Sequence, residues 1–223
     1  MAGAEVQTWP WGGEGKRGVT AVERSVRTIY VVGSTTMLSL WLAACAGGML
    51  GSGAPPTYDL TAPHVAHAGS KSRGQLVVSE PTALSVLDSD RIVVRSAGDQ
   101  VAHLANAQWS DRLPKLLQTR IVQAFEDASR LRAVGTPDER VSADYQLVTD
   151  VRAFEISVVS APMAQVEISA KVVSDHGGRI VAARVFRASI PAHSSEGQDA
   201  AVALDEAFHQ VTNDLVLWAS KLV

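Results

Sequence analysis

Apolar and polar side chains alternate along much of the second half of the chain, which is the period of a strand with one buried face. Over residues 165–174, Val166, Ile168 and Val172 fall on one face of such a strand. Residues 143–159 are predicted to form the longest strand, and a change of phase part-way along it indicates a β-bulge or a strand covered on both faces. Asp175-His176-Gly177-Gly178 has the composition of a hairpin turn, so residues 179–190 are predicted to return as the next strand.

Two segments instead repeat apolar residues every three or four positions, the spacing of one helical stripe. The first helix is predicted to begin at Trp109-Ser110 with Ser110 as its N-cap and Pro114 near its first turn. Its stripe consists of Leu113, Leu117, Ile121, Ala124, Phe125 and Ala128. The second is predicted from about Gln198 to the C-terminus, after Ser194 or Ser195 as a cap, and its stripe consists of Leu204, Phe208, Val211, Leu215, Trp218 and Leu222. Because strands precede it and the stripe is short, we expect it to pack on a sheet and not to form a coiled coil.

Shorter strands are predicted in the first half of the domain, at residues 58–60, 75–79 and 91–95. The Gly98-Asp99 turn should bring residues 101–104 back as the hairpin partner of the third, and the segment 135–138 should break the chain before the long strand. The order is therefore strands, helix, a three-stranded meander and a helix. This order predicts an α+β fold, a two-layer domain with a mainly antiparallel sheet and two helices on one face.

The first 57 residues follow a different pattern. Arg24 and Arg27 precede residues 28–58, which contain no charged side chain, and the apolar part of this run spans residues 29–44. It is short and diluted by Gly, Ser and Thr, whereas a transmembrane helix needs about 20 mostly apolar residues. We therefore expect residues 1–44 to be a signal peptide with a long n-region, and the Gly-, Ser-, Ala- and Pro-rich residues 45–57 to hold the processed terminus and a flexible tether. Residues 58–223 would form the working domain.

Cys45 is the single cysteine of the chain, which excludes an internal disulfide. It ends the apolar run in Leu42-Ala43-Ala44-Cys45, which resembles the lipobox of bacterial lipoproteins. The resemblance implies that a diacylglyceryl group is attached to the Cys45 thiol, that a peptidase cuts before Cys45, and that the new amino terminus is acylated. Several chains anchor a protein stably because each buried methylene contributes about 0.8 kcal/mol. Two alternatives stay open: an uncleaved membrane anchor with an ordinary cysteine, and a plain secretory signal.

The charge of the chain excludes one class of partner, nucleic acid. The chain has a formal net charge of −3; its first 44 residues contribute +1, from four basic and three acidic residues, which leaves −4 for the remainder. A protein that binds nucleic acid carries a basic patch or stripe, and this sequence has none, so no nucleic-acid partner is expected.

Catalytic motifs are absent from the sequence. It contains no Gly-x-Gly-x-x-Gly, no phosphate-binding loop and no Gly-x-Ser-x-Gly elbow. His64 and His67 have the spacing of a metal pair, but neither a thiol nor a carboxylate accompanies them. Asp88 and Asp90 supply too few oxygens for Ca²⁺. We therefore expect no enzyme activity, no cofactor and no metal.

Taken together, the motifs resemble the ABC-type transport auxiliary lipoprotein family, which includes the paraquat-inducible-operon lipoprotein C and lipoproteins encoded with MCE transporters. The segments that carry the resemblance are Cys45 with its lipobox, Tyr58-Asp59-Leu60, Ile92-Val93-Val94-Arg95, Trp109 with the helix after it, Ala143-Asp144-Tyr145-Gln146-Leu147, the hairpin around residues 175–186 and the last helix near Trp218.

The resemblance implies a non-catalytic, periplasm-facing lipoprotein of an ABC/MCE-type envelope lipid transport system, which docks the transporter at the membrane. Its partners would be MCE-domain, permease and ATPase subunits, the membrane through acyl chains (palmitate among them) on Cys45, and further copies of itself in a homo-oligomer. In the sorting rule of enteric bacteria an aspartate after the cysteine retains a lipoprotein in the inner membrane; Ala46 therefore favours the outer membrane. Two other functions stay open: a stand-alone lipid- or ligand-binding lipoprotein, and a hydrolase with a scattered site.

Overall fold

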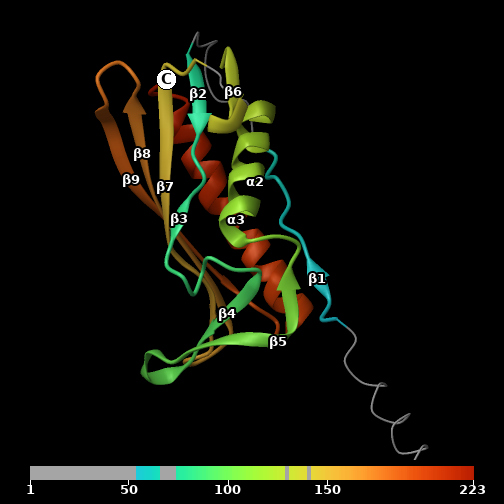
Figure 1. Ribbon diagram of the computed structural model, residues 1–223. Helices are drawn as coiled ribbons and strands as arrows, with labels where there is room; N and C mark the ends of the chain where they lie inside the picture. The colour runs from blue at the N-terminus through green and yellow to red at the C-terminus, as the bar shows by residue number, and fades with distance from the viewer. Residues whose placement is uncertain (1–53, 66–73, 129–130, 140–141) are drawn as a thin grey trace, which may run out of the picture. The chain divides into compact units, whose positions relative to one another are not determined.

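The computed structural model describes residues 54–65, 74–128, 131–139 and 142–223 (Figure 1). The signal peptide and the lipobox expected at residues 1–45 lie outside the described residues, as does His67. The described part contains two α-helices and a nine-stranded mixed sheet. The α+β class predicted from the order of patterns is therefore confirmed.

The sheet is organised around β7 (Tyr145–Ser157). β8 (Met163–Ser174) pairs with it antiparallel along its full length, and β9 (Arg179–Pro191) pairs antiparallel with β8 on the outer side. The register of β7 and β8 shifts between Val151 and Ala153, so the predicted change of phase is a bulge at Arg152. The turn between β8 and β9 holds Gly177 and Gly178 at φ of 90° and 66°, a region that glycine adopts without steric cost.

The other edge of β7 is shared by three short parallel strands, β2 (Gln75–Val78), β3 (Thr82–Ala83) and β4 (Arg91–Arg95). They are parallel to β7 because they form one passage of the chain along its length, interrupted after β2 by Pro81. β6 (Ala133–Gly135) adds parallel to β2. The expected antiparallel character thus holds for the long ladders, whereas most of the short strands pair in parallel.

β5 (Val101–Trp109) pairs antiparallel with β4 and is longer than the predicted residues 101–104. Its far end continues because β1 (Thr57–Tyr58) pairs in parallel with Gln108 and Trp109. Between the pairs Arg91–Gln108 and Val93–His103, β5 has more residues than β4, and the register is irregular there.

Both helices cover one face of the sheet, as predicted: α2 (Leu113–Ala128) lies beside β2 and β6, and α3 (Gly197–Ala219) crosses β8 and β9 (Figure 1). The apolar stripe of α2 is buried, and so is that of α3 from Leu204 to Leu215, while Trp218 packs at its margin. The helix ends at Ala219, short of the predicted C-terminus, so Leu222 packs on the core from beyond it. Large aromatic side chains fill the space between sheet and helices, with ring centroids 5.8 Å apart for Trp109 and Phe154 and 6.2 Å apart for Phe154 and Phe208.

The predicted start of the first helix is wrong. The N–H of Trp109 donates to the Asp90 carbonyl and that of Ser110 to the Tyr58 carbonyl, both at 2.7 Å, so these residues belong to the sheet and the helix begins at Leu113. The first N–H groups of a helix have no acceptor within that helix, whereas here the N–H groups of Trp109 and Ser110 find acceptors in distant segments of the chain.

The predicted caps of the last helix are also wrong, since Glu196 occupies the N-cap position without a side-chain cap. The Ser194 hydroxyl donates to the Asp199 carboxylate at 2.8 Å and accepts the N–H of Glu196 at 3.2 Å. Ser194 therefore supports the first turn through Asp199, and it lies two residues before the N-cap position.

Candidate functional site

The described chain begins with residues 54–65, here called the strap, which lies over the outside of the domain (Figure 1). Its first part forms β1 against β5, and Leu60 and Val65 are buried in the core. A guanidinium nitrogen of Arg120 on α2 lies 2.6 Å from a carboxylate oxygen of Asp59. Backbone pairing, apolar burial and an ion pair therefore fasten the strap at separate points.

Three polar residues fasten the strap to α3. The Thr61 N–H donates to Asp205 Oδ1 at 2.8 Å, and the Thr61 hydroxyl donates to Oδ2 at 2.7 Å. His209 Nε2 lies 2.7 Å from the same hydroxyl and 3.1 Å from the Thr61 carbonyl oxygen. We call Thr61, Asp205 and His209 the latch. Asp205 and His209 are one helical turn apart, so both side chains reach the strap from one face of α3.

The latch contains the residue types of a hydrolytic triad but not its geometry. In a triad the hydroxyl proton goes to the imidazole, and the carboxylate holds the opposite imidazole nitrogen. Here the Thr61 hydroxyl donates to Asp205, whose Oδ2 lies 3.7 Å from the same Nε2 that faces Thr61. Asp205 and Thr61 therefore share one imidazole nitrogen, the relay of a triad is not formed, and the arrangement suits the latch to holding the strap.

Sequence reasoning missed the latch and Arg120. Asp205 and His209 follow the helical spacing, but Thr61 lies 148 positions from His209, and no local pattern connects them. Asp88, considered for Ca²⁺, forms an ion pair with Arg112, which raises the pKa of that guanidinium. Among the described residues no three His, Cys, Asp or Glu side chains gather to hold a metal ion.

The face of the sheet opposite the helices carries ion pairs. Arg187 holds both carboxylate oxygens of Glu167, at 2.7 and 3.1 Å, and Arg152 at the bulge lies 3.5 Å from one of them. These bonds, that of Arg187 foremost, lower the pKa of the Glu167 carboxyl below its ordinary value. Arg95 on β4 likewise binds the buried Glu155 through two nitrogens, at 2.5 and 2.9 Å.

Three hollows on the described surface are open to solvent and have polar rims. One of about 300 Å³ lies beside Glu167 and Arg187, and one of about 310 Å³ lies at the start of α3 beside Tyr58 and Glu196. The third, of about 390 Å³, lies between the end of β9 and α3, with His193, Asp199 and Glu206 around Val202. Their shape suits transient surface contact better than enclosure of a ligand. Neither α2 nor α3, the α-helices of the described chain, has the length and apolar character that crossing a bilayer demands.

Comparison with known proteins identifies the family. A model of the ABC-type transport auxiliary lipoprotein component matches residues 58–216. Protein bll6063 of Bradyrhizobium diazoefficiens is 33% identical over 174 residues, which are 76% of this chain and 47% of that protein, so this chain spans about half the length of that relative.

Solved structures share the fold of the domain. Protein XCC0632 from Xanthomonas campestris, of the family DUF330, is similar with a TM-score of 0.69 and 32% identity over 75% of this chain and 96% of that one. A second crystal structure shares the fold, with a TM-score of 0.58 and 13% identity over 75% of this chain and 99% of its own. The chain belongs to the family of ABC-type transport auxiliary lipoprotein components.

Proposed function

We propose that the chain is anchored through acyl chains on Cys45 and serves as a non-catalytic, periplasm-facing subunit of an ABC/MCE-type envelope lipid transport system. Its task would be to dock the transporter, through MCE-domain and permease subunits, at the membrane that holds Cys45. The observation that carries the proposal is the family match over residues 58–216, which covers nearly all of the chain beyond the tether.

The strap supports an anchored role. Cys45 precedes Ala54 by nine residues, and an extended chain spans at most about 3.3–3.6 Å per residue, so the anchor would lie within about 30 Å of the strap. A force on the tether would act first on β1, and then on Leu60 and the latch beside it. Fastening at several points is what a domain held by its N-terminus requires.

We prefer docking to stand-alone ligand binding because the hollows described above are open and rimmed by charge. The outer membrane is the proposed location, because Ala46 is not the aspartate that retains lipoproteins in enteric bacteria. Separation of inner and outer membranes on a density gradient tests this location, and recovery in the inner fraction would contradict it.

Labelled palmitate tests the anchor. We expect the native chain to incorporate the label and Cys45→Ser to lose it, because no other thiol is present. Ser52→Ala in the tether is the matched control and should remain labelled. Equal labelling of Cys45→Ser, or a processed and membrane-bound product whose mass differs only by the substitution, would refute the lipobox.

Cross-linking in membranes tests the docking role. Capture of the tagged full chain should recover MCE-domain or permease subunits, whereas Cys45→Ser, released from the membrane, should recover fewer. Consistent recovery of neither by the native chain would count against the transporter role while leaving the lipid anchor intact.

A further inference from the structure

Four segments without charged residues meet at one end of the domain. In the sequence, residues 54–58, 100–110, 158–165 and 188–195 contain no Lys, Arg, Asp or Glu. In the fold these are the start of the strap, β5, the turn from β7 into β8, and the end of β9 with the loop into α3. We call the surface that they form the strap end.

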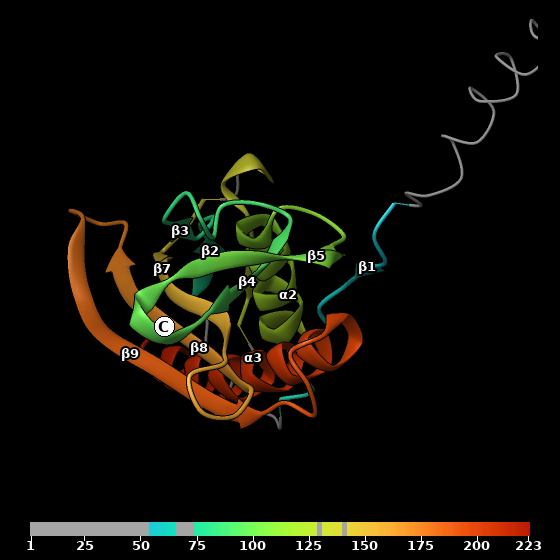
Figure 2. The same cartoon turned by 90° about the horizontal axis from the view of Figure 1, so that it is seen from below.

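Hydrogen bonds show that the strap end is continuous. The N–H of Val158 donates to the Arg95 carbonyl near the tip of the β4–β5 hairpin, and the N–H of Ala192 donates to the Pro162 carbonyl, both at 2.9 Å. A Cβ placed on Gly197, at the start of α3, would lie 3.3 Å from the Tyr58 hydroxyl oxygen. The start of the strap therefore lies beside the start of α3, which follows the loop from β9. Figure 2 views the domain from this side, with β5 crossing in front and β1 at one end of it.

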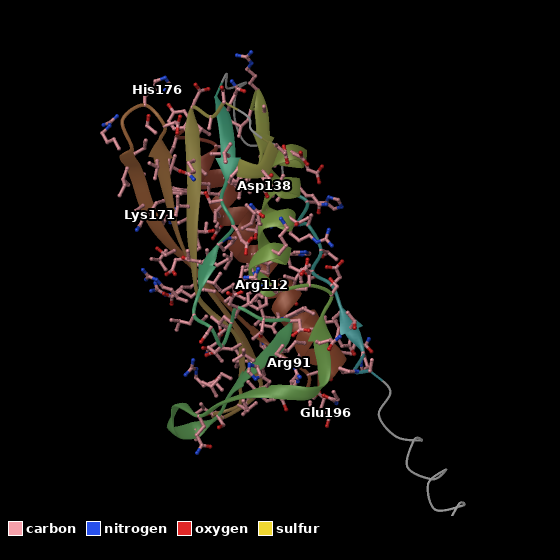
Figure 3. The ribbon with its side chains drawn as sticks, in the orientation of Figure 1. Arg91, Arg112, Asp138, Lys171, His176 and Glu196 are labelled. Atoms are coloured by element: carbon pink, nitrogen blue, oxygen red, sulfur yellow. The ribbon has the colours of Figure 1, made fainter. Side chains whose placement is uncertain are left out.

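Apolar side chains protrude at the strap end. Val101 is 40% exposed at the tip of the hairpin and Val159 is 59% exposed in the β7–β8 turn, and Ala102, Ala105 and Ala161 beside them are exposed as well. Arg95 is the charged residue beside them, since it pairs with Val101 across the β4–β5 hairpin, and its guanidinium is bound to Glu155. Arg91 and Glu196 border this end (Figure 3), and Asp199 and Glu206 lie beside the end of β9. Asp99 is the one charged residue between Ser96 and Ser110 in the sequence.

The opposite end of the domain differs. The β8–β9 hairpin there carries Lys171, Asp175, Arg179 and Arg184, and His176 lies at its turn (Figure 3). Ile180 is 54% exposed in this charged surrounding, so exposure of a single aliphatic residue is not what distinguishes the two ends. The distinguishing feature is the convergence of four neutral segments.

We propose that the strap end rests on the lipid surface in which the chain is anchored. The inference rests on the proposed acylation of Cys45, since the anchor would then lie within about 30 Å of Ala54. Charged groups lose hydration at the boundary of headgroups and acyl chains, whereas valine and alanine side chains gain there. Neutral loops with small, exposed apolar side chains suit shallow contact with a zwitterionic bilayer. The four segments contain no Lys or Arg that would select anionic lipid.

Site-specific quenching tests the contact on the full lipidated chain. Acylation consumes the Cys45 thiol, so Val101→Cys, Val159→Cys and Ile180→Cys each provide one free thiol for a bimane label. Ile180 is the matched control, an exposed aliphatic residue at the opposite end. In phosphatidylcholine vesicles with brominated acyl chains, we expect the labels at 101 and 159 to be quenched at least twofold more than the label at 180.

Each outcome separates the anchor from the contact. Protein on the vesicles with labels at 101 and 159 quenched no more than at 180 would overturn the contact and leave the anchor standing. Protein absent from the vesicles would overturn both. Shielding of these labels that requires added transporter subunits would show that the strap end binds protein, which also overturns the proposal.

Discussion

At the scale of single residues, the bonds that hold the strap are better defined than any reactive group. The Thr61 hydroxyl is shared by Asp205 and His209, and Leu60 beside it is fully buried. A hydrogen bond to a charged group contributes about 1.5–3 kcal/mol, and partial exposure reduces that amount. The latch should therefore contribute measurably to the stability of the domain.

We expect Thr61→Val, which keeps the shape and removes the hydroxyl, to lower the free energy of unfolding by about 1–2 kcal/mol. Urea denaturation followed by tryptophan fluorescence measures this change. The control is Thr119→Val, whose hydroxyl donates only to the Lys115 carbonyl within its own helix, and it should change stability by less than about 0.5 kcal/mol. Equal effects of the two substitutions would mean that the latch adds nothing beyond a surface hydroxyl.

Glu167, on the face of the sheet opposite the helices, should make the stability of the domain depend on pH. Hydrogen bonds from Arg187 lower the pKa of the folded carboxyl below its ordinary value of 4.5, so the unfolded chain binds the proton more tightly. The stability that this carboxylate contributes is therefore fully present above about pH 4.5. It is lost as the pH falls through the lower pKa that the group has in the folded protein. Glu167→Gln should cause a small loss of thermal stability at pH 7 that disappears on acidification. A loss that persists at low pH would point to packing as its cause, and Glu126→Gln on the exposed side of α2 is the control.

At the scale of elements, α3 is the main cover of the sheet. Its stripe packs on β8 and β9, and Phe208 is fully buried against Phe154. Local spacing predicted which face of this helix is buried, because a 3.6-residue period fixes the stripe without reference to its partner. The start of α2 was mispredicted because Trp109 and Ser110 bond to distant segments, whereas the cap of α3 was mispredicted because the Ser194 hydroxyl bonds to Asp199 within the first turn.

Phe208→Ala should lower the free energy of unfolding by about 3–5 kcal/mol, through lost burial and the cavity left in the core. Leu217→Ala on the same helix is the control, since Leu217 is 37% exposed, and it should cost less than about 1 kcal/mol. Chemical denaturation of both variants measures the difference. Similar losses would contradict the assignment of the buried face.

At the scale of the whole molecule, β9 is an edge strand, since among the described strands it pairs only with β8. Unpaired edges promote association unless charge, proline or a bulge protects them. β9 has arginines and a terminal proline, but its middle carries Ala182, Ala183 and Val185. This stretch is where a second copy of the chain could add a strand.

We therefore expect the purified protein to self-associate, and we expect Ala183→Lys, at an exposed position of β9, to shift it toward the monomer. Light scattering over a range of concentrations measures the shift. Val202→Lys, on the exposed face of α3, is the control and should leave the assembly unchanged. A native chain that remains monomeric at high concentration would refute self-association through this edge.

The sequence by itself determined the α+β class, the three-stranded meander, a change of phase part-way along the longest strand and the buried stripes of both helices; the structure placed that change at Arg152. All of these are periodic patterns within 10 to 20 neighbouring residues, and periodicity reports the direction of a buried face. The lipobox is local as well, and Cys45 stays a prediction outside the described residues.

Only the tertiary structure decided the parallel pairing along β7, the true start of α2, the latch and the strap end. Each depends on residues brought together from distant parts of the chain, such as Thr61 with His209 or Val158 with Arg95. Four neutral segments give no pattern when read in order. They become one surface because the sheet aligns their ends, and local sequence does not encode which ends will meet.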